Sequence, residues 1–396
     1  MSLQNPVFIP GPTNMPEALR RACDLPTIDH RSPGFPNLLM AAREGVQAVL
    51  KSSTAEVFIF PSTGTGGWET AIANTLQSGD SVLAVRNGMF SQKWIRMCSD
   101  FGLNVVSKDV PWGAGFDTAW AADQLAADTK HSIKAVLVTH NETATGVHSD
   151  IAEVRAALTA AGHPALLFVD GVSSIGSMDF RFDEWGVDVA VTGSQKGFML
   201  PAGLGIVGFS EKAMAATAQG GLPRGYFNIQ DMAASYATGG YPYTPPVGMV
   251  NGLKEACDML LNEGLETVFA RHRRIAEGVR AAVHAWGLKI CAHSPDLYSD
   301  SVTAIETPAG FDAGRVVAHA EAAYGVSFGA GLGDVAGKVF RIGHLGSLTD
   351  VMALSGIATA EMTMADLGLD ISLGSGVAAA QSVYRAGKTT QLSEAA

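Results

Sequence analysis

VDVAVTGSQK, residues 187–196, is the stretch that decides the fold, because it is a β-branched apolar run that ends in a lysine, Lys196. A second apolar run, residues 165–169, ends in Asp170. Buried β-branched runs are typical of strands in parallel sheets, and ligands of open α/β sheets bind beyond the carboxyl ends of the strands. The two runs therefore predict an amine and a carboxylate at one edge of a parallel sheet.

Lys196 and Asp170 together indicate pyridoxal-phosphate chemistry. Burial at the end of a strand favours the neutral amine of a lysine, which can attack an aldehyde. An aspartate at a neighbouring strand end can keep a pyridine nitrogen protonated, so that the cofactor ring serves as an electron sink. Either residue alone would be interpreted more simply, as a helix cap or a solvated loop charge. Only the pair favours the cofactor.

Residues 57–210 alternate short apolar runs with helical patterns, which predicts an α/β fold with a mostly parallel sheet and helices on both faces. We expect strands at residues 57–60, 81–85, 134–139, 165–170, 187–192 and 204–209. The last of these follows Lys196 too closely for a helical crossover, so we expect it to run antiparallel. Residues 220–248 are rich in glycine, proline and aromatic residues and predict an ordered loop.

A smaller α+β domain is predicted at the C-terminal end. Helical patterns cover residues 247–286, 312–324 and 349–367, and short strands are expected near residues 301–305 and 339–342. The last dozen residues are expected to be disordered. We therefore expect an N-terminal arm (residues 1–20), a large cofactor-binding domain (21–262) and a small C-terminal domain (263–396).

Composition excludes several classes of function. The net charge of −11 and the pI near 5.3 argue against nucleic acid as a partner, because binding its phosphates requires a basic surface. Apolar runs are too short to span a membrane. The four cysteines are widely spaced and show no metal-ligand pattern with the ten histidines, so we expect free thiols, a cytoplasmic protein and no metal site.

A glycine-rich segment, STGTGGWE at residues 62–69, follows the first expected strand and begins a helical pattern. Backbone amides at glycines and the positive end of a helix favour an anion, so the segment predicts a phosphate site. It matches neither a P-loop nor a dinucleotide fingerprint.

Three further residues follow expected strands or lie in one. Phe90 could lie over a cofactor ring, although a core aromatic is an equally good interpretation. Thr143 offers a hydroxyl to the cofactor, although ordinary turn chemistry also explains it. Arg341 is a charge among apolar residues that suits a substrate carboxylate, although a structural salt bridge is the simpler interpretation.

Taken together, the motifs resemble those of class V, fold-type I pyridoxal-phosphate aminotransferases, and specifically the alanine-, serine- and aspartate–glyoxylate aminotransferases. The resemblance covers nearly the whole chain. It is carried by PGPTN (residues 10–14), HRS (30–32), STGTGGWE (62–69), HNETATG (140–146), VDGV (169–172), GSQK (193–196) and FRIG (340–343). It implies a transaminase that moves the amino group of L-aspartate or L-serine to glyoxylate, giving glycine and the corresponding 2-oxo acid.

The resemblance also implies roles for individual residues. Lys196 would bind pyridoxal 5'-phosphate covalently and act as the base, and Asp170 would pair with the ring nitrogen. The remaining contacts to the cofactor would come from Thr143 and Gln195 on the oxygen side of the ring, from Phe90 by stacking, where several relatives carry tryptophan, and from Thr65 and Gly66 at the phosphate. Gly11 and Arg341 would hold the α-carboxylate of the substrate.

Tyr241 and Thr244 match positions that, in such enzymes, reach the phosphate of the neighbouring subunit. The resemblance therefore implies a homodimer with shared active sites, and it leaves open whether dimers pair into tetramers. An aspartate donor would need a second cation for its side-chain carboxylate. His30, Arg31, Arg86 and Arg224 are the candidates, and the sequence does not choose between aspartate and serine.

Two other interpretations stay open at this point. Another class V enzyme, a lyase or a cysteine desulfurase, would keep the cofactor, although none of the four cysteines lies in an obviously flexible glycine-rich loop. A non-catalytic binding protein could share the fold, but the intact pair Asp170 and Lys196 argues against it.

Overall fold

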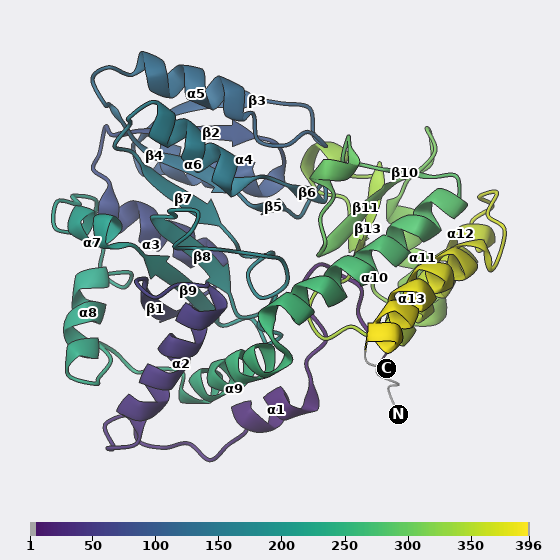
Figure 1. Ribbon diagram of the computed structural model, residues 1–396, viewed down its shortest axis with the longest axis horizontal. Helices are drawn as coiled ribbons and strands as arrows, with labels where there is room; N and C mark the ends of the chain where they lie inside the picture. Colours follow the sequence, from purple (N-terminus) through teal and green to yellow (C-terminus); the bar gives the residue numbers. More distant parts are fainter. Residues whose placement is uncertain (1–4, 395–396) are drawn as a thin grey trace.

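A computed structural model describes residues 5–394, with side chains to residue 386. It contains a large sheet with helices on both faces and a smaller sheet beside the long helix α10 (Figure 1). Residues 1–4 of the predicted N-terminal arm and residues 395–396 lie outside the described residues. The boundaries expected at residues 20 and 262 stay predictions.

The large sheet has seven strands in the order β1-β9-β8-β7-β4-β2-β3, and β9 alone runs antiparallel to its neighbours. Its strands are β1 (Glu56–Pro61), β2 (Ser81–Arg86), β3 (Asn104–Asp109), β4 (Ile133–Thr139), β7 (Leu166–Asp170), β8 (Val189–Gly193) and β9 (Leu204–Phe209). The mostly parallel sheet and the antiparallel β9 are confirmed. A short hairpin, β5 (Asn141–Glu142) and β6 (Val147–His148), follows β4.

Alternating side chains of these strands pack into two separate apolar clusters. In β1, for example, Val57 and Ile59 face one cluster and Phe58 and Phe60 face the other. One face is covered by α1 (Glu17–Cys23), α2 (Phe35–Val49), α5 (Thr118–Ala127), α6 (Ile151–Ala160) and α9 (Val247–Glu263). The other is covered by α3 (Gly64–Thr75), α4 (Met89–Asp100), α7 (Glu211–Thr217) and α8 (Ile229–Ala237).

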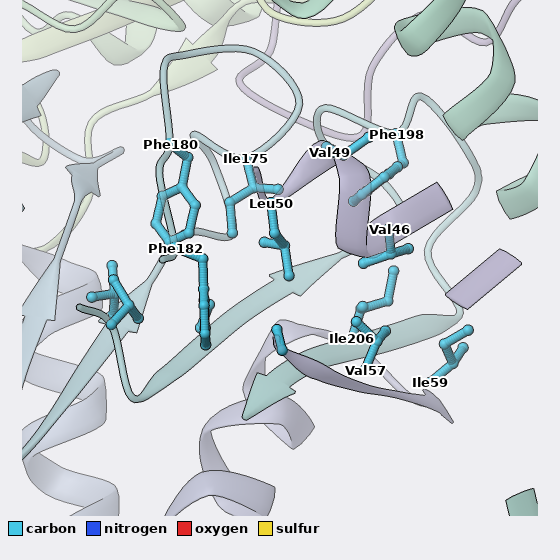
Figure 2. Packing of buried hydrophobic residues seen from close by; sticks show 14 of the residues in the cluster. Val46, Val49, Leu50, Val57, Ile59, Ile175, Phe180, Phe182, Phe198 and Ile206 are labelled. Carbon is cyan, nitrogen blue, oxygen red and sulfur yellow. The ribbon is translucent and has the colours of Figure 1, made fainter. Parts of the chain in front are cut away.

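The first of these clusters also supports the residues that flank the sheet's carboxyl edge. Figure 2 shows Ile175 and Phe198 in it, together with Val46 and Val49 of α2. Phe198 follows Lys196 by two positions, and Ile175 lies in the turn after Asp170. Packing of these two apolar side chains therefore holds the segment that follows Lys196 and the turn that follows Asp170 against the sheet.

A four-stranded antiparallel sheet forms the core of the smaller unit, in the order β10-β11-β13-β12. Its elements are α10 (Leu265–Ala285), β10 (Lys289–Ile290), η1 (Pro295–Leu297), β11 (Val302–Glu306), α11 (Gly314–Tyr324), β12 (Gly329–Ala330), η2 (Gly333–Val335), β13 (Val339–Gly343), α12 (Asp350–Asp366) and α13 (Ser375–Glu394). Within residues 5–394, none of the helices is long and apolar enough to cross a membrane.

Three sequence expectations differ from the structure. β3 was missed, because this edge strand is half-exposed and contains only two apolar residues, Val105 and Val106. The expected loop at residues 220–248 contains α8, whose first turn is capped by the Asn228 side chain. The C-terminal segment continues as α13 to Glu394, so the expectation of disorder from residue 385 was wrong there. α13 as a whole packs against α10, a contact that includes the hydrogen bond from Tyr384 Oη to the Ile275 carbonyl, and the helix continues from there into the polar segment.

The N-terminal segment links the two units. Phe8 is buried in the core of the smaller unit, where its amide donates to the Ser327 carbonyl at 2.9 Å. A few residues further on, the Thr13 hydroxyl is 3.4 Å from the carbonyl oxygen of Lys196. Residues 8–13 therefore cross from the small sheet to the edge of the large one.

Candidate active site

The carboxyl ends of β4, β7 and β8 meet at one edge of the large sheet. Thr139 of β4 pairs with Asp170 of β7, and Asp170 in turn pairs with Val191 of β8. Thr143 and Lys196 follow closely after β4 and β8. The arrangement predicted from the two apolar runs, a carboxylate and an amine at one edge, is present.

Lys196 is partly buried, and its side chain ends beside the N-terminal segment. Its Nζ donates to the Pro10 carbonyl. A Cβ placed on Gly11 would lie 2.6 Å from this Nζ and 2.7 Å from Cε, so only glycine leaves room for the lysine. Burial and, to a smaller extent, the positive charge of Arg341 lower the pKa of Lys196, Asp170 opposes the shift, and the resulting pKa is about 8. The amine is thus far easier to deprotonate than a surface lysine.

Asp170 is buried, and its Oδ1 accepts a hydrogen bond from the Val172 amide at 2.9 Å. Burial raises the pKa of this carboxyl to about 7, and the negative charge of Glu142 adds to the effect. The amide of Val172 and the charge of Lys196 act in the opposite direction. A cationic partner would restore the ionised form, as expected of a carboxylate that pairs with a protonated ring nitrogen.

Arg341 lies in β13 of the small sheet and reaches into the same site. Its Nη1 donates to the Thr143 carbonyl and its Nε to the Ala330 carbonyl, both at 2.9 Å. Burial lowers its pKa to about 10, opposed by the charge of Glu142. The structural salt bridge that was the simpler interpretation is not what holds Arg341, since both partners of its hydrogen bonds are backbone carbonyls. Its charge remains available to a substrate carboxylate.

Thr65 and Gly66 lie in the first turn of α3, directly after β1. The preceding Thr63 makes no side-chain capping bond, so the positive end of a 12-residue helix has no side-chain acceptor there. A Cβ on Gly66 would overlap the Ser62 hydroxyl, and one on Gly64 would overlap Val172 of the turn after Asp170. The glycines therefore allow α3 to begin next to the site.

Phe90 and Gln195 lie at the same edge. Phe90 is half-buried in the first turn of α4, and its amide donates to Glu142 Oε2 at 3.0 Å. The Oε1 atom of Gln195 is buried, and within the described residues it has no hydrogen-bond partner. The structure thus brings Lys196, Asp170 and Gln195 to the edge where α3, with its glycines, and α4, with Phe90, also begin.

Tyr241 and Thr244 do not contact the residues at the Lys196 edge of their own chain in any of the described interactions. The Tyr241 hydroxyl donates to the Ile59 carbonyl of β1, inside a group of tyrosines that includes Tyr243. Thr244 is exposed and lines a cavity of about 350 Å³ together with His30. Within one chain, Tyr241 is therefore bound to β1, and Thr244 lies at a cavity that the loop after α1 also lines.

All four candidate cations have partners within their own chain, and the shortest contacts are those of Arg86 and Arg224. Arg86 forms ion pairs with Asp109 at 2.8 Å and Asp334 at 3.2 Å. Arg224 Nη1 donates to three carbonyls, including that of Ala73 near the far end of α3. His30 and Arg31 form longer ion pairs, each at 3.9 Å from Asp29, and the Arg31 side chain is largely exposed.

Sequence reasoning missed two residues that organise the site. Glu142 is fully buried, accepts from the amides of Phe90 and Ser91, and acts electrostatically on both Asp170 and Arg341. Ser173 accepts the Thr143 hydroxyl at 2.7 Å. Glu142 could have been identified from sequence, because a carboxylate in a turn that is expected to be buried requires partners. Ser173 could not, because a serine in a turn is ordinary.

Comparison with known proteins places the chain in a family. The model of the class V aminotransferases matches residues 27–332. The chain is 69% identical to an L-aspartate–glyoxylate aminotransferase of Paracoccus denitrificans over 97% of both chains, and 52% identical to a serine–glyoxylate aminotransferase of Hyphomicrobium methylovorum over 97% of this chain and 95% of the other. A crystal structure of pyridoxamine–pyruvate aminotransferase from Mesorhizobium loti superposes with a TM-score of 0.90 at 30% identity, covering 98% of this chain and 99% of that one. This chain belongs to the class V aminotransferases.

Proposed function

We propose that this aminotransferase depends on pyridoxal 5'-phosphate and moves the amino group of L-aspartate or L-serine to glyoxylate, giving glycine and the corresponding 2-oxo acid. The observation that carries the proposal is the convergence of Lys196, Asp170 and Arg341, contributed by both sheets. An easily deprotonated amine, a buried carboxylate and a buried guanidinium are the groups such a reaction requires. The 69% identity to an L-aspartate–glyoxylate aminotransferase supports the substrates.

The residues present fit the cofactor. The N-terminus of α3, without a side-chain cap, suits a phosphate held by Thr65 and Gly66. The buried, unpartnered Oε1 of Gln195 indicates a polar ligand next to Lys196. In the proposed arrangement, Asp170 would pair with the ring nitrogen and Lys196 would hold the cofactor covalently. Thr143 and Gln195 would bind the oxygen side of the ring, and Phe90 would stack on the ring.

Pyridoxal phosphate, when bound, carries the amino group between the two substrates and withdraws electrons from the substrate's α-carbon. Lys196 Nζ would hold the cofactor covalently and, when free, would take the α-proton of the substrate, which its lowered pKa favours. Asp170 stabilises positive charge on the ring nitrogen. Arg341 and the backbone at Gly11 bind the α-carboxylate and thereby orient donor and acceptor alike.

We further propose a homodimer in which Tyr241 and Thr244 complete the phosphate site of the partner subunit. Thr244 is exposed in the single chain, as a residue that serves a partner must be. Exposed apolar side chains on the neighbouring α1–α2 region, Leu25, Ile28 and Met40, support a covered surface there. The Tyr241 hydroxyl already donates to the Ile59 carbonyl of β1 in its own chain. In the dimer, Tyr241 would therefore contact the partner's phosphate site with its ring, or its hydroxyl would leave Ile59 and bind the phosphate instead.

The second cation for an aspartate donor is proposed to be His30 or Arg31. Arg86 and Arg224 already satisfy acceptors of their own chain, whereas the loop that carries His30 and Arg31 lies beside Thr244. If Thr244 binds at the partner's active site, the loop with His30 and Arg31 lies close to that site as well. A dicarboxylate whose second charge is left unpaired in a desolvated pocket is strongly disfavoured.

All four cysteines are free thiols, and three of them are buried. Cys23, the remaining one, is half-buried in α1, a helix rather than a mobile loop. Burial raises the pKa of each of these thiols, which opposes the thiolate that a cysteine desulfurase requires. The thiols also support the proposal of a reducing, cytoplasmic environment.

A donor panel tests the proposed function. The purified protein should be yellow, and glycine formation from glyoxylate should be fastest with L-aspartate or L-serine. Lys196→Ala should abolish the visible absorption and nearly all turnover. Lys212→Ala is the matched control, because burial lowers the pKa of Lys212 as well, yet it lies at the start of α7 beside Asp188. A borohydride-reducible lysine adduct in Lys196→Ala would refute the assignment.

A further inference from the structure

A buried histidine, His140, lies directly behind the site. It follows β4 and precedes the hairpin that leads to Thr143, and its side chain is completely buried. Three aromatic rings surround it edge-on: His148 with ring centroids 4.9 Å away, and Phe180 and Trp185 each 5.6 Å away. These three rings leave the imidazole of His140 little room to tilt out of its plane.

Both ring nitrogens of His140 have hydrogen-bond partners. Nδ1 is 2.8 Å from the Ser174 hydroxyl, and Nε2 is 3.1 Å from Nε2 of His148. Burial lowers the pKa of both histidines, which favours the neutral imidazoles, and one Nε2 atom of the pair donates to the other. Rotating the ring by half a turn would break both contacts, so the network selects a single orientation.

Ser174 belongs to the turn that holds Asp170. Its amide donates to the Gly171 carbonyl at 3.1 Å, and the same turn supplies the Val172 amide that bonds Asp170 Oδ1 at 2.9 Å. The backbone amide of His140 donates to the Asp170 carbonyl at 3.0 Å. His140 thus contacts Asp170 directly through its main chain, and its side chain contacts Ser174 in the turn that follows Asp170.

The same turn touches the phosphate-binding helix. Val172 fills the space that a side chain on Gly64 would occupy at the start of α3. A shift of the turn would therefore move Asp170 and the N-terminus of α3 relative to each other. Fixing Ser174 fixes the spacing between the groups proposed to bind the two ends of the cofactor.

We infer that His140 is a positioning residue for the cofactor, acting through Ser174 to hold the turn that aligns Asp170 with the start of α3. This inference rests on the proposed function, because Asp170 matters in this way only if it faces the cofactor ring.

Two conservative replacements of His140 distinguish the contact of its imidazole with Ser174 from its contact with His148. His140→Asn keeps a nitrogen near the position of Nδ1, within reach of Ser174, whereas His140→Gln keeps one near Nε2, within reach of His148. Ser174→Ala removes only the hydroxyl and is small enough to leave the fold intact. His163→Gln is the matched control, since His163 is also buried but bonds Asp128 beyond the opposite end of β7.

The experiment measures binding of pyridoxal 5'-phosphate to the cofactor-free chain, followed by steady-state kinetics of each loaded variant. Ser174→Ala and His140→Gln should bind the cofactor about tenfold more weakly, the lower end of what outer partners of metal ligands contribute, and should lower kcat. The KM for glyoxylate should not change, because Arg341 is untouched. His140→Asn should bind like the parent, and so should the control.

The outcomes separate two failures. If the parent chain does not bind the cofactor, the proposed function fails and the inference fails with it. If the parent binds normally and Ser174→Ala binds equally tightly, the inference alone is overturned. Equal damage in His140→Asn and His140→Gln would also overturn it, because the effect would then not depend on the contact with Ser174.

Discussion

Replacing Gly11 by alanine should inactivate the enzyme through Lys196. The added Cβ would lie 2.6 Å from Nζ and 2.7 Å from Cε of the lysine. Ordinary contacts between such atoms are about 3.5–4.0 Å, so the end of the lysine must move by about 1 Å. A displacement of that size at a reacting group costs roughly 100-fold in rate, and we expect kcat to fall by about this factor.

Gly79→Ala separates this effect from backbone strain. Gly11 and Gly79 both have positive φ, +103° and +87°, so alanine at either position is strained by roughly 1–3 kcal/mol. Near Gly79, however, an added Cβ would meet nothing within 4 Å. Urea unfolding should therefore show similar losses of stability in the two variants, while glycine formation should collapse only in Gly11→Ala. If kcat of Gly11→Ala stays within about threefold of the control, crowding of Lys196 does not govern the chemistry.

Three more outcomes follow from the site. Mixing Tyr241→Ala chains with Lys196→Ala chains should restore activity by placing one intact site in each heterodimer; demonstrated subunit exchange without recovered activity would exclude shared sites. The ratio of kcat/KM for aspartate over that for serine should fall in His30→Ala or Arg31→Ala, and an unchanged ratio in both would remove them as the second cation. In the cofactor-free chain, the pKa of Asp170 is raised from 3.8 to about 7, so its contribution to stability is present at low pH and is lost as the pH rises from about 4 to 7. Urea unfolding of Asp170→Asn should lack this decline, and identical pH profiles for parent and variant would contradict the raised pKa.

Most of the large sheet could be predicted from sequence, because strands buried on both faces are continuous apolar runs bounded by turns. β8 and β9 show this best, since nearly all their side chains are apolar and the short connection between them dictates antiparallel pairing. β3 could not be predicted in this way, since an edge strand needs little apolar surface.

The site was predictable where strand ends alone place a residue, as for Asp170 and Lys196. It was not predictable where distant segments meet. The Pro10 carbonyl that accepts from Lys196 lies 186 positions away in the chain. The partners of Arg86 and Arg224 were equally hidden, because an arginine in a sequence does not reveal whether its own chain already supplies its acceptors.

The two carbonyls that hold Arg341 have a consequence for how such an enzyme can diversify. They belong to Thr143, after a strand of the large sheet, and to Ala330, in the small one. A backbone carbonyl is present whatever side chain its residue carries, so point substitutions at these two positions cannot delete the anchors. The proposed binding of the α-carboxylate by Arg341 would thereby be inherited with the fold, and natural selection would be free to alter the surrounding side chains that distinguish one amino donor from another.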